Sequence, residues 1–171
     1  GTNGIAINLA GSTLQTSIHD GDVFDHITDF SDTADHDAIV GTEGAANHTI
    51  TVSGNVVITG DIVAGESVAG DNDIINLSSA NLALIGSDVI EFESINVIEN
   101  SVLSLSQNSS IVGTITVNGD KTLDLTLEDS SLNGNGSDAV TFGAGNDSIA
   151  IRGVSSIAGD INGGDGDDTL N

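Results

Sequence analysis

Three copies of a nine-residue unit lie near the end of the chain and constrain its fold more than any other feature. The copies are 133–141, 142–150 and 163–171, and the third fits the pattern G-G-x-G-x-D-x-U-x, with U a large aliphatic residue, at every fixed position. Glycine permits the positive φ of a tight turn, and the aspartate supplies an oxygen at the bend. Each unit therefore predicts one bend of a coiled chain, followed by a short strand with an aliphatic side chain pointing inward.

These units resemble the calcium-binding nonapeptide repeats of RTX proteins. The resemblance implies that calcium is held between the glycine-rich loops of successive coils, by main-chain carbonyls and aspartate carboxylates. The residues that it assigns to the metal are Asp138, Asp147, Asp165, Asp167, Asp168, Gly143, Gly145, Gly164 and Gly166, with Gly134 and Gly136 shaping the first loop.

The spacing of the copies leaves two interpretations of these aspartates open. The first two copies are in tandem and would make one 18-residue coil, whereas the third begins 21 residues after the second, so the loops need not superpose. Aspartates at such bends also accept hydrogen bonds from main-chain amides in β-helices that bind no metal. Calcium binding and simple turn capping both remain hypotheses for this region.

From Thr49 onward, short aliphatic segments recur without any helical period. Most have four to six residues, are rich in β-branched side chains and are bounded by Gly, Asn, Asp or Ser, as expected of strands. The segments are 49–52, 56–59, 74–77, 82–85, 94–97, 101–106, 114–117, 122–127 and 148–151. Segments 55–62, 108–115 and 154–161 also share Ile-x-Gly-[Asp or Thr]-Ile, at intervals of 53 and 46 residues. Each interval would hold two coils if one coil takes somewhat more than about 20 residues.

This pattern predicts an all-β fold, a right-handed parallel β-helix (β-solenoid) built as a single repeat array. A β-sandwich is disfavoured because two-residue Asn-Gly or Asp-Gly turns between matched strands are scarce. We expect one continuous solenoid with irregular N-terminal coils in 1–48, regular coils in 49–132 and nonapeptide-bearing coils in 133–171. Through segments such as 92–97 and 108–117, the chain from about Thr49 is similar to the passengers of bacterial autotransporter (type V secreted) adhesins.

The charge of the chain limits its partners. Lys121 and Arg152 are the only two basic residues against 26 acidic ones, giving a formal net charge of -24. Nucleic acid and anionic membranes are therefore disfavoured, and divalent cations are the natural counterpart. No apolar run approaches the roughly 20 residues of a membrane helix, so we expect no membrane insertion by this segment.

No catalytic constellation is evident, and we expect a protein that is not an enzyme. Two basic residues cannot line a groove for acidic sugars, which pectate-lyase-like β-helices require. The segment Gly65-Glu-Ser-Val-Ala69 does not match the G-x-S-x-G motif of a serine nucleophile.

An acidic segment near the N-terminus carries three of the four histidines. Its potential ligands are Asp22, Asp25, His26, Asp29, Asp35, His36 and Asp37. Three interpretations stay open: a solvated acidic loop, an oxygen-rich calcium site, and a transition-metal site that uses histidine.

These observations favour a structural or adhesive β-solenoid segment of a large secreted or surface-displayed bacterial protein, located outside the cell. Its partners would be a host or cell-surface receptor or neighbouring copies of itself. The alternative is a calcium-binding RTX block of a type I secreted protein that folds when it binds calcium outside the cell.

Overall fold

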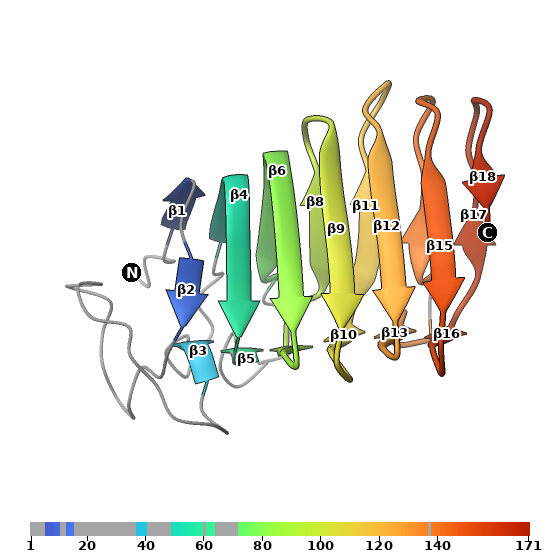
Figure 1. The fold of residues 1–171 in the computed structure, drawn as a ribbon. Coiled ribbons are helices and arrows are strands. Elements are labelled where there is room, and N and C mark those ends of the chain that lie inside the picture. Colours follow the sequence, from blue (N-terminus) through green and yellow to red (C-terminus); the bar gives the residue numbers. More distant parts are fainter. Residues whose placement is uncertain are drawn as a thin grey trace.

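A computed structural model of the chain describes residues 6–10, 13–15, 37–40, 49–59, 61–63, 72–136 and 138–171. All of the described strand pairs are parallel, and no helix occurs among these residues. The strands form layers that stack from the N-terminal to the C-terminal end of the molecule (Figure 1). The predicted all-β fold, with parallel strands stacked as a β-solenoid, is confirmed.

Each coil of the solenoid contributes strands to three faces. Face 1 consists of β1 (Ala6–Ala10), the first halves of β4 (Thr49–Thr59) and β6 (Ile74–Ile85), β8 (Ser94–Val97), β11 (Thr114–Val117), β14 (Val140–Thr141) and β17 (Ile161–Asn162). Face 2 consists of β2 (Thr13–Gln15), the second halves of β4 and β6, β9 (Ser101–Ser106), β12 (Leu123–Glu128), β15 (Ser148–Arg152) and β18 (Thr169–Leu170). Face 3 consists of β3 (Asp37–Val40), β5 (Asp61–Val63), β7 (Asp88–Ile90), β10 (Ser110–Val112), β13 (Ser131–Asn133) and β16 (Ser156–Ala158).

The chain bends three times in each coil. We call the bend between faces 1 and 2 the first corner, the bend between faces 2 and 3 the second corner, and the bend that leads to face 1 of the next coil the third corner. The long strands β4 and β6 run through the first corner, whereas later coils insert a loop there, as the upper edge of Figure 1 shows.

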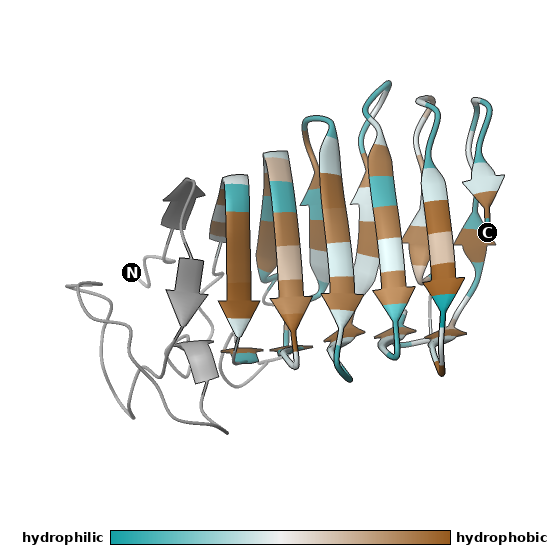
Figure 2. Ribbon diagram, in the orientation of Figure 1, coloured by the Kyte–Doolittle hydropathy of each residue, from teal (hydrophilic) through white to brown (hydrophobic). Residues whose placement is uncertain are grey.

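Rows of aliphatic side chains fill the interior along the solenoid axis. Strands alternate buried and partly exposed residues, as in the pattern of β8, because successive side chains of a strand point to opposite faces. Parallel pairing in register then stacks each buried residue on its equivalent in the next coil, so that Leu82, Leu103 and Leu125 form one row. The hydrophobic bands lie at matching heights on neighbouring strands in Figure 2. Together these continuous rows of buried side chains make up the hydrophobic core.

The register shows that the coils differ in length. On face 1, the coil that leads from Ile75 to its partner Ile95 is shorter than the coil that leads from Ile115 to its partner Val140. Segments 108–115 and 154–161 are equivalent and lie two coils apart, as their sequence likeness predicted. Segment 55–62 is displaced, because Ile62 is equivalent to Ile111, whereas the sequence likeness aligned it with Ile115. The extra residues are taken up by the corners.

Candidate metal centre

The second and third nonapeptides stack at the first corner of successive coils. Ser148 pairs with Thr169 and Ile149 with Leu170, so the loop 142–147 lies against the loop 163–168. The interval between these two copies is the length of one coil, and the expectation that their loops need not superpose was wrong. The prediction of an 18-residue coil from the two tandem copies was also wrong, because those copies occupy different corners of a longer coil.

The glycines of these loops let main chain pack directly on main chain. A Cβ on Gly164 would meet the carbonyl oxygen of Gly143, and a Cβ on Gly166 would meet that of Gly145. Gly164 and Gly166 also have φ of +72° and +120°, in the region that side chains other than glycine rarely adopt. The main-chain N–H of Asp165 donates to the oxygen of Gly143 at 2.9 Å. The four glycines assigned to the metal therefore allow the two loops to pack closely on each other.

Asp147 occupies an inward position of the core at this corner. The position corresponds to Leu123 in the preceding coil and to Asp168 in the next, as the register of β12, β15 and β18 requires. Asp147 is only 2% exposed. One oxygen, Oδ1, accepts a hydrogen bond from the N–H of Leu123 at 2.6 Å, and the N–H of Asp147 donates to Oδ1 of Asp168 at 2.9 Å. The capping role is thus fulfilled by one oxygen of each aspartate.

The other carboxylate oxygen of Asp147, Oδ2, is buried and has no hydrogen-bond partner among the described residues. Burial raises the pKa of Asp147, and the charges of Asp168 and Asp124 raise it further, while the main-chain amides of Leu123 and Gly143 oppose the rise. A buried carboxylate oxygen without a partner is costly. Its environment therefore favours either a proton or a cation at this oxygen.

The three aspartates of the third nonapeptide are exposed. Asp165 directly follows Gly164, and Asp167 directly follows Gly166. The N–H of Asp167 donates a hydrogen bond to Oδ1 of Asn146 at 3.1 Å. Within the described part of the chain, no group of three or more His, Cys, Asp or Glu side chains is arranged to hold a metal. A cation here would thus be held by Asp147, Asp168 and main-chain oxygens of the two loops. Calcium accepts such mixed oxygen ligands.

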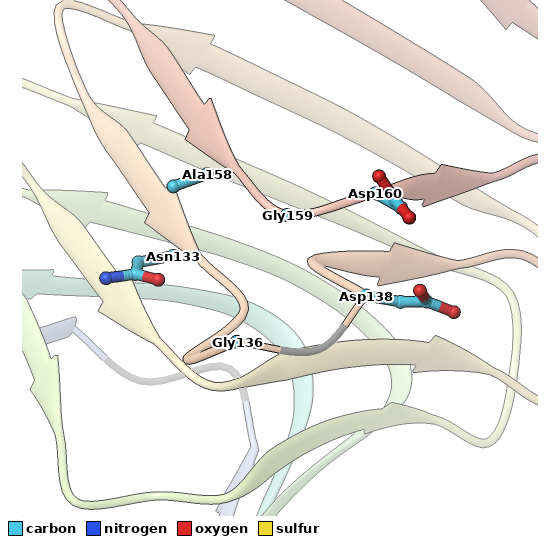
Figure 3. A pocket seen from close by; sticks show the side chains of 6 residues that line it. All are labelled: Asn133, Gly136, Asp138, Ala158, Gly159 and Asp160. Atoms are coloured by element: carbon cyan, nitrogen blue, oxygen red, sulfur yellow. The ribbon is translucent and has the colours of Figure 1, made fainter.

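Asp138, from the first nonapeptide, lies away from this site at the third corner. It is close to Asp160, which lies in the next coil. The main-chain carbonyl of Asp160 accepts hydrogen bonds from the N–H of Ala139 at 2.8 Å and the N–H of Val140 at 3.3 Å. Both residues border an open hollow of about 420 Å³, lined by Asn133, Gly136, Asp138, Ala158, Gly159 and Asp160. In Figure 3 the Asp138 and Asp160 side chains lie on neighbouring coils, on the same side of the hollow. The structure therefore separates Asp138 from Asp147 and Asp168.

A column of serines at the second corner was not anticipated from the sequence. Its members are Ser87, Ser109, Ser130 and Ser155. The N–H of Ser87 donates to Oγ of Ser109 at 3.0 Å, and the N–H of Ser130 donates to Oγ of Ser155 at 3.1 Å. These contacts join adjacent coils where the strand ladder is interrupted. The sequence signal that could have revealed the serine column is a repeated dipeptide, in which Gly, Asn or Asp precedes each serine. The preceding residues Gly86, Asn108 and Asp129 all have positive φ.

The acidic and histidine-rich segment near the N-terminus lies outside the described residues, except for Asp37 at the start of β3. The ligand hypotheses for Asp22, Asp25, His26, Asp29, Asp35 and His36 stay predictions.

The fold places this chain in the class of parallel β-solenoid repeat proteins. No family model, no curated protein and no solved structure matches the chain. Among the described residues, no helix is long and apolar enough to span a lipid bilayer.

Proposed function

We propose that this chain is a structural β-solenoid segment of a large secreted or surface-displayed bacterial protein, with a non-catalytic role in adhesion. The observation that supports the proposal is the unbroken register of the core rows, such as the one through Ile50, Ile75, Ile95, Ile115 and Val140. Each added coil lengthens such a rod by about 4.8 Å, because it continues the same rows of core side chains. A rod of this kind suits the extension of a binding surface away from a cell.

The outward side of face 1 supports a role in contact with other molecules. Its partly exposed positions carry uncharged polar side chains, among them Thr51, Asn76, Asn96, Thr116 and Thr141. In a chain with a net charge of -24, this strip adds no charge that would repel an acidic cell-surface receptor or a neighbouring copy.

The surface location is tested by antibody labelling of intact source cells before and after permeabilisation. Labelling of intact cells that is removed by external protease supports the proposal, whereas labelling only after permeabilisation contradicts it. The structural role is tested on the isolated chain with EDTA present. A β-type circular dichroism spectrum and an elongated scattering profile are expected, and a random-coil spectrum would overturn a role as a self-sufficient rod.

Calcium binding is the second candidate function, and the unpartnered Oδ2 of Asp147 between two glycine-rich loops favours it. The site residues fit a hard divalent cation, which would supply positive charge to the buried carboxylate. Calorimetric titration of the EDTA-treated chain with calcium tests this function. A saturable isotherm that is lost in Asp147→Asn supports it, and the absence of heat above the dilution control contradicts it.

A further inference from the structure

The described strands of face 1 contain no charged residue. Face 2 carries charged residues such as Asp124 and Arg152, and face 3 carries Asp61 and Asp88. Acidic residues flank face 1 at the corners, as Glu93 does directly before β8. The outward side of face 1 is therefore an uncharged strip bordered by negative charge.

Two rows of outward side chains run along this strip, parallel to the solenoid axis. Row A consists of Thr49, Ile74, Ser94 and Thr114, and row B consists of Thr51, Asn76, Asn96, Thr116, Thr141 and Asn162. Pairing in register places neighbours within a row about 4.8 Å apart, and the pleat places the two rows about 6.6 Å apart. Apart from Ile74, the rows form a regular grid of hydroxyl and amide groups.

The members of row B from β4 to β11 make no side-chain hydrogen bond within the described part of the chain. Outward polar side chains on the other faces do make such bonds. On face 2, Nδ2 of Asn81 donates to Oδ1 of Asn55 at 3.1 Å, and on face 3, Oγ of Ser110 donates to Oδ1 of Asp88 at 2.6 Å. Row B thus presents donors and acceptors that are occupied by water alone, and a ligand of similar polarity can replace that water.

These features favour a neutral ligand that repeats the same contact from coil to coil. The acidic corners would repel an anionic polymer, and they would attract a cationic polymer away from the uncharged rows. The described strands of face 1 contain no aromatic residue, so ring stacking cannot hold a single sugar there. Each exposed hydrogen bond contributes little, because it replaces a bond to water. Useful affinity therefore requires many equivalent contacts on one ligand.

We propose that rows A and B bind a neutral, extended polysaccharide, which lies along the solenoid axis. Its hydroxyl groups donate to and accept from the Thr, Ser and Asn side chains of successive coils. This inference rests on the adhesive role proposed above and names the chemical class of the partner. Binding does not involve the glycine-rich loops at the first corner, so it occurs without calcium.

Co-sedimentation of the whole chain with insoluble cellulose, chitin and mannan, in EDTA, tests the proposal. Retention by at least one of these polymers is expected, and it should persist at high salt because no ion pairs are formed. Carboxymethyl-cellulose, a cellulose with added carboxylates, should retain less of the chain at low salt. Retention by none of the three neutral polymers would overturn the proposal, and so would stronger retention by carboxymethyl-cellulose than by all of them.

Competition with soluble sugars tests the need for repeated contacts. A six-sugar oligomer of the retained polymer should displace the chain at a lower concentration of sugar units than the monosaccharide does. Equal potency per sugar unit would contradict binding along the rows.

Two substitutions on β6 give a matched pair with the same change in charge. Asn76→Asp puts a carboxylate into row B, where the neutral ligand would desolvate it, and should lower retention about 10-fold. Asn81→Asp makes the same change at an outward position of face 2 and should leave retention unchanged.

A second pair removes a hydroxyl group and keeps the β-branched shape that suits a strand. Thr116→Val changes row B and should lower retention by about 2- to 10-fold, the effect of one lost hydrogen bond. Thr126→Val, at a partly exposed position of β12 on face 2, should have no effect. Equal losses within both pairs would overturn the location on face 1. This second pair decides the location if Asn76→Asp does not fold.

The remaining outcomes separate this proposal from its alternatives. Sedimentation of the chain without polysaccharide, abolished in Asn76→Asp, would overturn it in favour of a second copy of the chain on face 1. Retention by no polymer would leave the surface location, tested by antibody labelling, standing. A random-coil spectrum in EDTA would overturn the rod and, with it, the rows.

Discussion

The N–H of Leu123 donates a hydrogen bond of 2.6 Å to Oδ1 of Asp147, and the two residues are equivalent positions of adjacent coils. The core row at the first corner thus changes from a fully buried leucine to a buried carboxylate in one step. Asp147 replaces the strand hydrogen bond that the inserted loop interrupts. Its second oxygen, Oδ2, is the part of the side chain that capping leaves unexplained.

The pKa of Asp147 predicts a pH dependence for the metal-free chain. Burial, followed by Asp168 and Asp124, raises this pKa above the ordinary value of 3.8. A carboxyl group with a raised pKa in the folded state takes up a proton on folding, so it favours the folded state below pH 3.8, and this contribution is lost as the pH rises through the folded pKa. Asp147→Asn lacks this loss, so in EDTA its stability relative to the unsubstituted chain should improve as the pH rises toward neutral.

The measurement is thermal unfolding of both proteins in EDTA across the acidic to neutral range. The titration of carboxyl groups remote from Asp147 is common to both proteins and cancels in the difference. The stability difference should change in favour of Asp147→Asn as the pH rises. A difference that is independent of pH would show that Asp147 does not titrate in the folded state.

Gly145 provides a test of the close packing between loops. A Cβ at this position would meet the carbonyl of Lys121 and lie 2.9 Å from Cγ2 of Thr122. Gly145→Ala should therefore displace the 142–147 loop and cost about 2–3 kcal/mol by urea unfolding, the upper range for overpacking. Gly119→Ala is the control, because Gly119 has φ of +59° but nothing within 4 Å of the added atom. It should cost only about 1 kcal/mol of backbone strain, and an equal cost in both variants would contradict the packing argument.

The sequence predicted the strands of faces 1 and 2 well. The expected segments 94–97, 101–106 and 114–117 coincide with β8, β9 and β11, because alternation of aliphatic and polar residues over four or more positions is a strong signal. The expected segments 49–52 and 56–59 are joined in β4, since Gly54, with φ of +70°, lets the strand turn the corner without a break. The face 3 strand β10 was not predicted, because it has three residues and a single buried aliphatic side chain.

The nonapeptide motif identified the candidate site only in part. It indicated Asp147 and Asp168 with their glycines, but it also grouped Asp138 with them. The motif reports a local bend, and the corner at which the bend lies depends on the lengths of all preceding coils. Those lengths differ from coil to coil on face 1 and cannot be read from a nine-residue pattern.

Ser109 tests the contribution of the serine column. Its Oγ accepts from the N–H of Ser87 at 3.0 Å and donates to the carbonyl of Ser106 at 2.7 Å, and the residue is 0% exposed. Ser109→Ala removes both of these hydrogen bonds, so we expect a loss of about 1–3 kcal/mol in urea unfolding. Ser104→Ala, at a partly exposed position on β9, is the control and should change stability by less than about 0.5 kcal/mol. Similar effects in both variants would mean that the column does not stabilise the coils.

The aliphatic row through face 2 offers a comparison between a buried leucine and an exposed leucine. Leu103 and Leu170 occupy equivalent positions three coils apart, but Leu103 is 0% exposed and Leu170 is 67% exposed. Leu103→Ala should cost about 2–5 kcal/mol, because it opens a cavity between two covered layers. Leu170→Ala removes a side chain packed on one side only and should cost less than about 1 kcal/mol. Urea unfolding followed by circular dichroism gives both values, and equal losses would show that a further layer covers Leu170 in solution, for example one from a second copy of the chain.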